Sequence, residues 1–158
     1  MLNGLKTVIE KARLIAEKTE GGETAFLAKS LAPDMFPFSR QIQIATDNAK
    51  GAVARLTQTE NPKYADTETT FLELEARIDK TIAFLNTFKP EQFVNVEKMK
   101  VELPYFPGKH MLGDAYFKEY ALPNFFFHVT TAYAIVRSLG GELGKPDYMH
   151  SLPLIPNE

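Results

Sequence analysis

Residues 38–57 read FSRQIQIATDNAKGAVARLT. Apolar side chains recur in this stretch every three or four residues, so they lie on one face of an α-helix. The face consists of Phe38, Ile42, Ala45, Ala49, Ala52 and Leu56. Its small alanines allow a neighbouring helix to approach closely. The stretch therefore predicts a long helix that packs against other helices.

Three more stretches have the same periodicity and predict helices at residues 2–18, 67–88 and 123–139. Paired glycines and prolines separate them, because both residue types favour helix ends. Four amphipathic helices with mostly short connections predict an all-α protein, an up-down four-helix bundle with one domain over residues 1–158. We expect its core to contain Ile42, Ala49, Phe71, Ile78, Phe125 and Val129.

Shorter features are predicted at three other places. Residues 24–30 fit a short helical turn. Asp66 or Thr67 is expected to cap the third long helix, because both side chains can accept a hydrogen bond from a free backbone N–H. Residues 142–158 contain three prolines and predict a tail.

The segment between the third and fourth long helices differs in character from the rest. Residues 93–112 alternate loosely and contain turn formers, which predicts a small β-hairpin or an irregular loop. Residues 113–120 fit a separate short helix. Pro123 suits the first turn of a new helix, so we expect the fourth helix to begin there.

The composition argues against several classes of protein. The 158 residues are 44% hydrophobic and 24% charged, as in a globular domain. The formal net charge is −2 and no basic cluster occurs, so we expect no nucleic-acid partner. No stretch reaches the ~20 apolar residues that span a bilayer, so we expect no membrane insertion. The charged N-terminus does not fit a secretory signal, and the absence of cysteine fits a reducing cytoplasm.

His128 lies within the apolar face of the fourth predicted helix, with Asn124 on its flank. A buried imidazole needs a hydrogen-bond partner or a metal, because an unpaired polar group costs about 1–3 kcal/mol. We expect the ring to be largely buried and hydrogen-bonded. A metal needs several ligands, yet Ala132 stands one turn after His128. No spacing requires the other two histidines, His110 and His150, to join it.

A polar stripe runs along the helix at residues 38–57, nearly opposite its apolar face. It consists of Arg40, Gln43, Asp47 and Lys50. This position favours a solvated surface. Two alternatives stay open, which are a dimer contact and a cleft covered by the loop after the third helix.

Three consecutive phenylalanines, Phe125, Phe126 and Phe127, point around most of the circumference of the fourth helix. Large aromatic side chains stabilise a protein mainly when they are buried. We therefore expect the predicted hairpin or a second subunit to cover this part of the helix.

Four segments of the chain resemble a bacterial family of unknown function. They are residues 32–52 (APDMFPFSRQIQIATDNAKGA), residues 66–71 with Arg77 and Ile78, residues 121–135 (ALPNFFFHVTTAYAI) and residues 143–147 (LGKPD). That family is grouped with the DinB/YfiT-like metalloenzyme superfamily, and the resemblance covers almost the whole chain. It implies a four-helix bundle, often dimeric, with a pocket between helices.

The resemblance to the wider superfamily also implies a location for a metal. Three histidines typically bind a divalent ion there, one from helix two and two, a turn apart, from helix four. Some members transfer thiols such as bacillithiol or mycothiol. In this chain only His128 matches a ligand position, and Ala132 stands at the second. The position on helix two falls near Gln43, Ile44 or Asp47, so the resemblance implies a degenerate metal site.

Three functions are compatible with these observations. The first is binding of a small molecule between helices, without a metal cofactor, by the polar groups of His128, Asn124, Asp47, Gln43 and Arg40. The second is a metal-dependent hydrolase or thiol transferase whose divalent ion is held by His128 and a ligand such as Asp47. The third is a non-catalytic homodimer that serves as an interaction protein.

Overall fold

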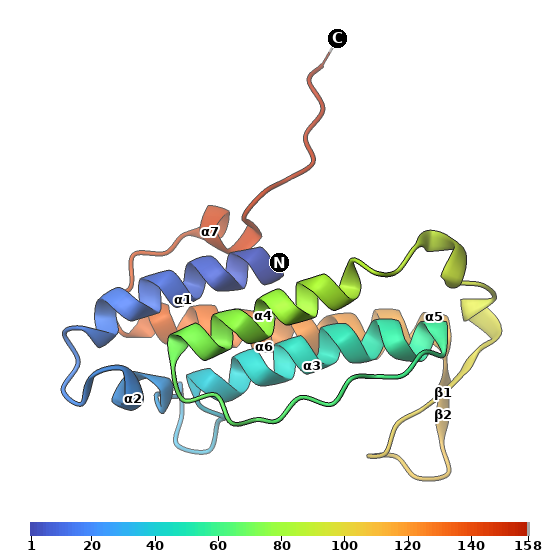
Figure 1. Cartoon of the computed structure of the whole chain (residues 1–158), viewed down its shortest axis with the longest axis horizontal. Helices are drawn as coiled ribbons and strands as arrows, with labels where there is room; N and C mark the ends of the chain where they lie inside the picture. Colours follow the sequence, from blue (N-terminus) through green and yellow to red (C-terminus); the bar gives the residue numbers. More distant parts are fainter. Residues whose placement is uncertain (158) are drawn as a thin grey trace.

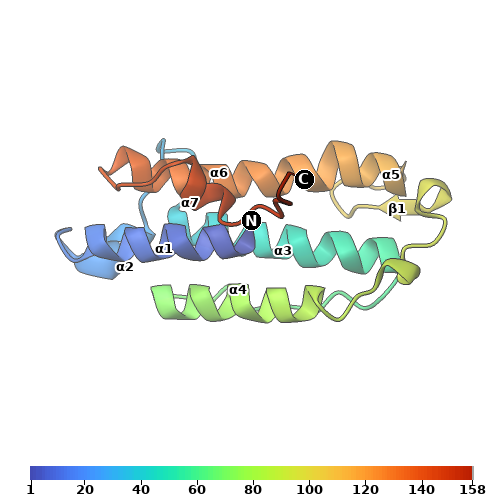
Figure 2. The same ribbon diagram turned by 90° about the horizontal axis from the view of Figure 1, so that it is seen from above.

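The computed structural model describes residues 1–157, and its main body is a bundle of four helices (Figure 1, Figure 2). These helices are α1 (Leu2–Ala16), α3 (Phe38–Thr57), α4 (Phe71–Leu85) and α6 (Leu122–Ser138). The predicted all-α bundle is confirmed, and α3 has the predicted bounds. A short helix, α2 (Gly22–Leu27), lies close to the predicted helical turn. No helix of residues 1–157 has the length and apolarity needed to cross a membrane.

The helices of the bundle do not strictly alternate in direction. α3 and α4 run the same way, and α1 and α6 run the opposite way (Figure 2). Phe38 and Phe71 begin α3 and α4, and their ring centroids lie 6.2 Å apart. The reason is the connection at residues 58–70, which returns along α3 before α4 begins (Figure 1).

The core runs along the middle of the bundle. Phe26 and Phe38 close one end of it edge to face, with ring centroids 5.3 Å apart. Four of the six predicted core residues are at most 1% exposed, namely Ile42, Phe71, Ile78 and Val129. The other two, Ala49 and Phe125, are partly buried and pack against this core.

α4 begins later than the sequence pattern predicts. Its N-cap is Thr70, whose hydroxyl accepts a hydrogen bond from the Glu73 N–H at 3.2 Å. In return, the Glu73 carboxylate accepts one from the Thr70 N–H at 3.0 Å. This reciprocal capping box satisfies two backbone donors at once. The predicted cap at Asp66 or Thr67 is therefore wrong, and Asp66 pairs with arginines instead.

A small sheet follows α4, after the short 3₁₀ turns η1 (Pro90–Gln92) and η2 (Val96–Lys98). Strand β1 (Lys100–Glu102) pairs antiparallel with β2 (His110–Leu112). Val101 lies opposite Met111 in this pairing. The predicted small β-hairpin between the third and fourth long helices is confirmed.

α6 is the end of a longer helical segment. α5 (Gly113–Ala115) leads into a π-helical stretch, η3 (Tyr116–Ala121), which leads directly into α6. The predicted break before Pro123 is therefore wrong. Proline cannot donate an N–H, and its ring clashes with the carbonyl four residues earlier in an ideal α-helix. The wider π-helical turns before Pro123 let the helix pass through the proline without a break.

The predicted tail at residues 142–158 is wrong for its first part. Helix α7 (Lys145–Met149) packs across α1 (Figure 2). A Cβ atom at Gly4 would lie only 2.3 Å from the carbonyl oxygen of Tyr148, so the two backbones touch there. Tyr148 also packs edge to face on Tyr133 of α6, with centroids 5.8 Å apart. The described residues after α7 extend away from the bundle (Figure 1).

Candidate functional site: a polar cleft between two helices

A polar cleft of about 550 Å³ opens between α3 and α6. Four of the five predicted binding residues line it, namely Arg40, Asp47, Asn124 and His128. The fifth, Gln43, is buried outside the lining. Leu103 and Tyr105, from the loop between β1 and β2, border the cleft. Of the alternatives for the polar stripe, the structure thus favours a cleft covered in part by the segment after α4.

His128 is 7% exposed and hydrogen-bonded, as the sequence predicts. Its Nδ1 atom lies 2.7 Å from the Gln41 side-chain oxygen. The Gln41 amide nitrogen donates to the carbonyl of Phe36 at 2.8 Å, which identifies the Gln41 oxygen as an acceptor. Nδ1 must therefore carry the ring proton, and Nε2 has a free lone pair.

The Nε2 atom of His128 is available to a ligand. Among residues 1–157, the only buried side-chain nitrogen or oxygen without a hydrogen bond is Asn48 Nδ2. His128 Nε2 also has no protein partner there, but it is not one of these buried atoms. It is therefore exposed to solvent, at the cleft that His128 lines. Burial, and then the positive charge of Arg40, lower the pKa of His128 below its ordinary value. The ring is neutral at pH 7 and presents an acceptor.

The polar stripe of α3 is only half solvated, because Arg40 and Asp47 face the open cleft but the other two residues are covered, so the prediction of a solvated surface is corrected. Lys50 and Gln43 are each only 5% exposed. The connection at residues 58–70 covers this face of the helix: Glu68 accepts a hydrogen bond from Gln43 at 2.9 Å, and Asn61 accepts one from Lys50 at 3.3 Å. The helical periodicity of α3 could not reveal this cover, because it comes from a distant part of the chain.

Arg77 of α4 joins the stripe to this connection. Its side chain is 2% exposed, and its Nη2 atom lies 2.8 Å from Asp47 Oδ1 and 3.0 Å from Asp66 Oδ1. Its Nη1 atom donates to Glu68 Oε1 at 2.9 Å. Asp47 Oδ1 also lies 3.2 Å from the Lys50 ammonium. The carboxylate of Asp47 therefore faces the cleft already neutralised by two cations.

Arg40 is likewise engaged by a carboxylate, since it pairs with Asp66. Burial alone would raise the pKa of Asp66, but the hydrogen bonds and charges of Arg40 and Arg77 outweigh burial and lower that pKa. Asp66 is therefore ionised at neutral pH and holds the connection against α3. Its carboxylate binds these arginines, while Thr70, four residues later, caps α4.

Asn48 lies between the polar cleft and a second hollow, and it lines both. Its side-chain oxygen accepts a hydrogen bond from Asn124 Nδ2 at 3.1 Å. Asn124 is thus held in place by α3 rather than free in the cleft. The Nδ2 atom of Asn48 keeps a donor without a protein partner in the described part of the chain.

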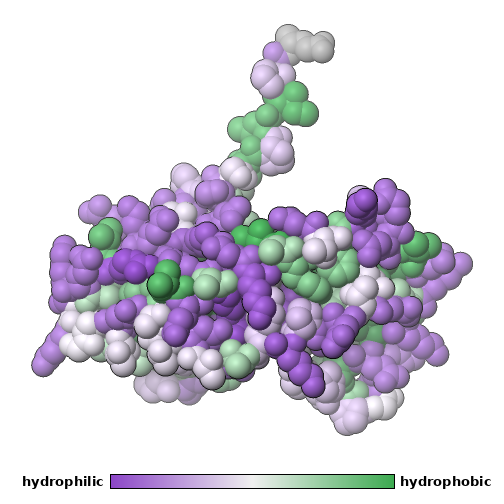
Figure 3. Space-filling model, in the orientation of Figure 1, coloured by the Kyte–Doolittle hydropathy of each residue, from purple (hydrophilic) through white to green (hydrophobic). Residues whose placement is uncertain are grey.

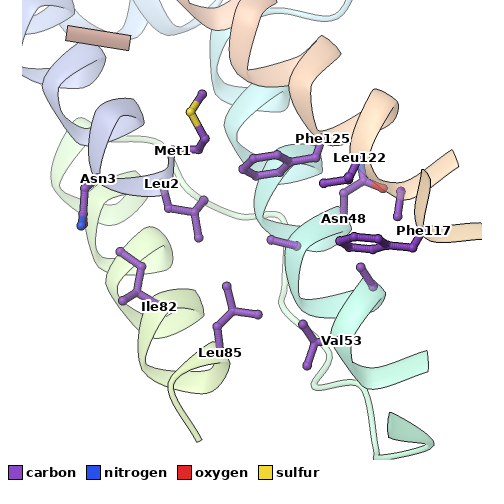
Figure 4. Close-up of a pocket in the computed structure, with 13 residues that line it drawn as sticks. Met1, Leu2, Asn3, Asn48, Val53, Ile82, Leu85, Phe117, Leu122 and Phe125 are labelled. Atoms are coloured by element: carbon purple, nitrogen blue, oxygen red, sulfur yellow. The ribbon is translucent and has the colours of Figure 1, made fainter. Parts of the chain in front are cut away.

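The second hollow, here called the apolar pocket, has a volume of about 390 Å³. Phe117, Leu122 and Phe125 face it on one side, and Ile82 and Leu85 of α4 on the other (Figure 4). Apolar surface gathers near the foot of the C-terminal segment, over the start of α1 and the end of α4 (Figure 3). No titratable side chain lines the pocket. It offers shape and apolar contact, but no acid–base chemistry.

The residues around His128 do not fit a divalent metal. Within residues 1–157, no group of three or more His, Asp or Glu side chains is placed to hold an ion. Ala132 is fully buried in the core, His110 lies on β2, and His150 follows α7. Asp47, the nearest predicted carboxylate ligand, is neutralised by Arg77 and Lys50. The positive charges of both side chains disfavour a further cation at this carboxylate.

Sequence reasoning missed several residues of this site. Gln41 lies next to Ile42 on the buried side of α3, and Arg77 lies next to Ile78 on the buried side of α4. A polar residue beside an apolar position of a helix is a usable signal, because a buried polar group needs partners. Asn48 and Arg55 also stand beside apolar positions, Ala49 and Leu56, so this signal alone does not separate cleft residues from other polar residues of α3.

The comparisons with known proteins agree with this architecture. Residues 1–149 match a family described as a domain of unknown function, DUF1993. A crystal structure at 1.83 Å resolution, of a DinB family member protein from Shewanella denitrificans, is 39% identical in sequence and has a TM-score of 0.92. The match covers 99% of this chain and 89% of the other. No curated protein matches the chain. The chain therefore belongs to the DUF1993 family, and it has the fold of a DinB family member.

Proposed function

We propose that this protein binds a small polar molecule in the cleft between α3 and α6. One observation carries the proposal, which is the free lone pair of His128 Nε2 at the wall of an open cleft. The Nδ1–Gln41 hydrogen bond orients the ring, so Nε2 can accept a hydrogen bond from an OH or NH group of the ligand. Asn124 and Asp47 also line the cleft beside it.

The polar groups of the cleft are held in place before a ligand arrives. Asn124 is bonded to Asn48, Asp47 to Arg77, and His128 to Gln41. Side chains that are already ordered lose little conformational freedom when they bind. This preorganisation favours specific binding, and it does not require a metal or a covalent step.

The proposal is tested by screening a library of small polar fragments with ligand-observed NMR. We expect some fragments to bind the parent protein and the His110→Ala control equally. The same fragments should bind His128→Ala at least tenfold more weakly. His110 is an exposed histidine on β2, so its removal controls for the loss of an imidazole alone. If no fragment depends on His128, the proposal is wrong.

We also propose a homodimer, because two of the three consecutive phenylalanines stay exposed in the single chain. Phe126 is 40% and Phe127 is 55% exposed, so the hairpin does not cover them. Of the two covers that the sequence suggests, a second copy is the one left. Exposed aromatic side chains at the centre of a surface are typical anchors of protein interfaces.

Sedimentation at micromolar concentration tests the dimer. We expect a mass of twice the 17.8 kDa chain. Phe127→Asp should give the monomer mass, whereas Phe106→Asp should not, because Phe106 is 49% exposed but lies on the hairpin loop. A parent protein that sediments as a monomer would contradict the proposal.

A further inference from the structure

Arg55 is the one arginine of the cleft lining without a carboxylate partner in the part of the chain that the structure describes. It lies in the last turn of α3. Its only side-chain hydrogen bond there is from Nη1 to the Tyr116 hydroxyl, at 3.3 Å. A guanidinium has five N–H donors, so most of them stay available. Arg40, by contrast, is paired with Asp66.

A glycine one turn earlier leaves room for the Arg55 guanidinium. A Cβ atom at Gly51 would lie 2.5 Å from Arg55 Nη1, which is too close for any real contact. The missing side chain at Gly51 therefore leaves the space that the guanidinium occupies. On its other side, the guanidinium carbon lies 6.0 Å from the centre of the Tyr116 ring.

Tyr116 supports this arrangement without neutralising the charge. It is 2% exposed and stacks on Tyr120, with ring centroids 5.9 Å apart. Burial raises the pKa of the Tyr116 hydroxyl, so it stays protonated at neutral pH. Arg55 therefore keeps its full positive charge beside a rigid aromatic wall.

Positive side chains outnumber negative ones among the residues that line the cleft. Three cations line the cleft, namely Arg40, Lys50 and Arg55, against a single carboxylate, Asp47. That carboxylate is already shared by Arg77 and Lys50. The end of the cleft near Arg55 thus has unpaired N–H donors and no free carboxylate among its lining residues.

We infer that the Arg55 end of the cleft binds an anionic group, a carboxylate or a phosphate, of the ligand. The inference rests on the proposed function and names the class of molecule. A planar guanidinium matches both anions because two of its N–H groups can bind two oxygens at once. Gln41, which holds His128, is ten residues before Gly51 on α3, roughly 15 Å along the helix axis. A molecule that reaches both His128 and Arg55 is therefore elongated, with its negative charge at one end.

The experiment titrates the protein with inorganic phosphate, acetate and uncharged acetamide while the Arg55 Nε–H signal is followed by NMR. We expect a saturable shift with phosphate or acetate and none with acetamide. The stronger of the two anions identifies the chemical group. Arg55→Gln should bind at least tenfold more weakly. Gly51→Ala should also shift the Arg55 Nε–H signal, because the new methyl group requires the guanidinium to move while alanine favours the helix.

Arg137→Gln is the matched control, since Arg137 lies near the end of α6 and bonds the Gly141 carbonyl at 2.7 Å. Its removal changes the net charge by the same amount and should leave anion binding unchanged. An equal loss in Arg137→Gln and Arg55→Gln, or no response to either anion, would overturn the inference. His128→Ala should still bind the anion, because one small ion reaches only one end of the cleft. If the Arg55 signal responds to an anion but no fragment depends on His128, the proposed function is wrong and anion binding at Arg55 still holds.

Discussion

The polar cleft and the apolar pocket lie on two sides of α3 and meet at Asn48. Both are open hollows of comparable size, about 550 and 390 Å³. They differ in what their walls can do. Apolar burial is not directional, so the apolar pocket, apart from the amides of Asn3 and Asn48, selects a ligand by shape. The cleft holds a neutral imidazole, a paired carboxylate and an unpaired guanidinium in fixed positions.

The polar cleft owes its ordered side chains to a connection between helices as well as to the helices themselves. The apolar pocket is lined by alanines of the predicted seam of α3, Ala49 and Ala52. On the polar face of α3, residues 58–70 cover the stripe, and Arg77 forms an ion pair with the Asp47 carboxylate. Four variants or conditions distinguish the two hollows by their effect on stability.

Arg77→Ala should lower the free energy of unfolding by about 3–5 kcal/mol, because it leaves several carboxylates near one another without their buried cation. Urea unfolding measures the loss. Lys6→Ala removes a more exposed ion pair, with Asp79, and should cost no more than about 1 kcal/mol. If the two variants lose the same free energy of unfolding, Arg77 does not hold residues 58–70 against α3.

His128→Ala should cost roughly 1–3 kcal/mol, through the lost hydrogen bond to Gln41 and a small cavity. His110→Ala, on the exposed hairpin, should cost almost nothing. The melting temperature of the parent should not change when a chelator is added. If a chelator lowers the melting temperature of the parent but not that of His128→Ala, then His128 holds a metal and the residues around it do fit one.

Ala49→Leu should fill part of the apolar pocket and raise the free energy of unfolding by about 0.5–2 kcal/mol. The reason is that Ala49 is only partly buried and borders open space. Ala54→Leu is the control, because Ala54 is 1% exposed and overpacking there should cost about 1–3 kcal/mol. The His128 signals should stay unchanged in Ala49→Leu. A shift would mean that the two hollows are coupled through Asn48.

The smallest effect concerns pH. The pKa of His128 is lowered in the folded protein, whereas an unfolded histidine titrates near 6.5. The unfolded chain therefore takes up a proton first as the pH falls. Stability is fully present above about pH 6.5 and decreases below it. The urea concentration at the midpoint of unfolding should therefore decrease when the pH is lowered from about 7.5 to about 5. The decrease should be smaller in His128→Gln. If the urea midpoint decreases equally in His128→Gln, the pH dependence arises from other titratable groups.

Much of the fold follows from local patterns. The three-four spacing of apolar residues predicts α3 at its observed bounds, and it places Ile42, Ile78 and Val129 in the core. The burial of His128 follows from the same spacing, because the ring projects into an apolar face. Turn formers predict the hairpin. In each case the signal is confined to neighbouring residues of one helix or turn, which share a face whatever the rest of the chain does.

How these elements cover one another depends on contacts between distant segments of the chain. Arg77 of α4 pairs with both Asp47 and Asp66, the extra helix α7 contacts α1 at Gly4, and Arg55 bonds the hydroxyl of Tyr116. These contacts join residues far apart in the sequence, and a helical period records nothing about them. The physical reason is that periodicity reports which side chains leave water, whereas ion pairs and clefts depend on which distant segment replaces that water.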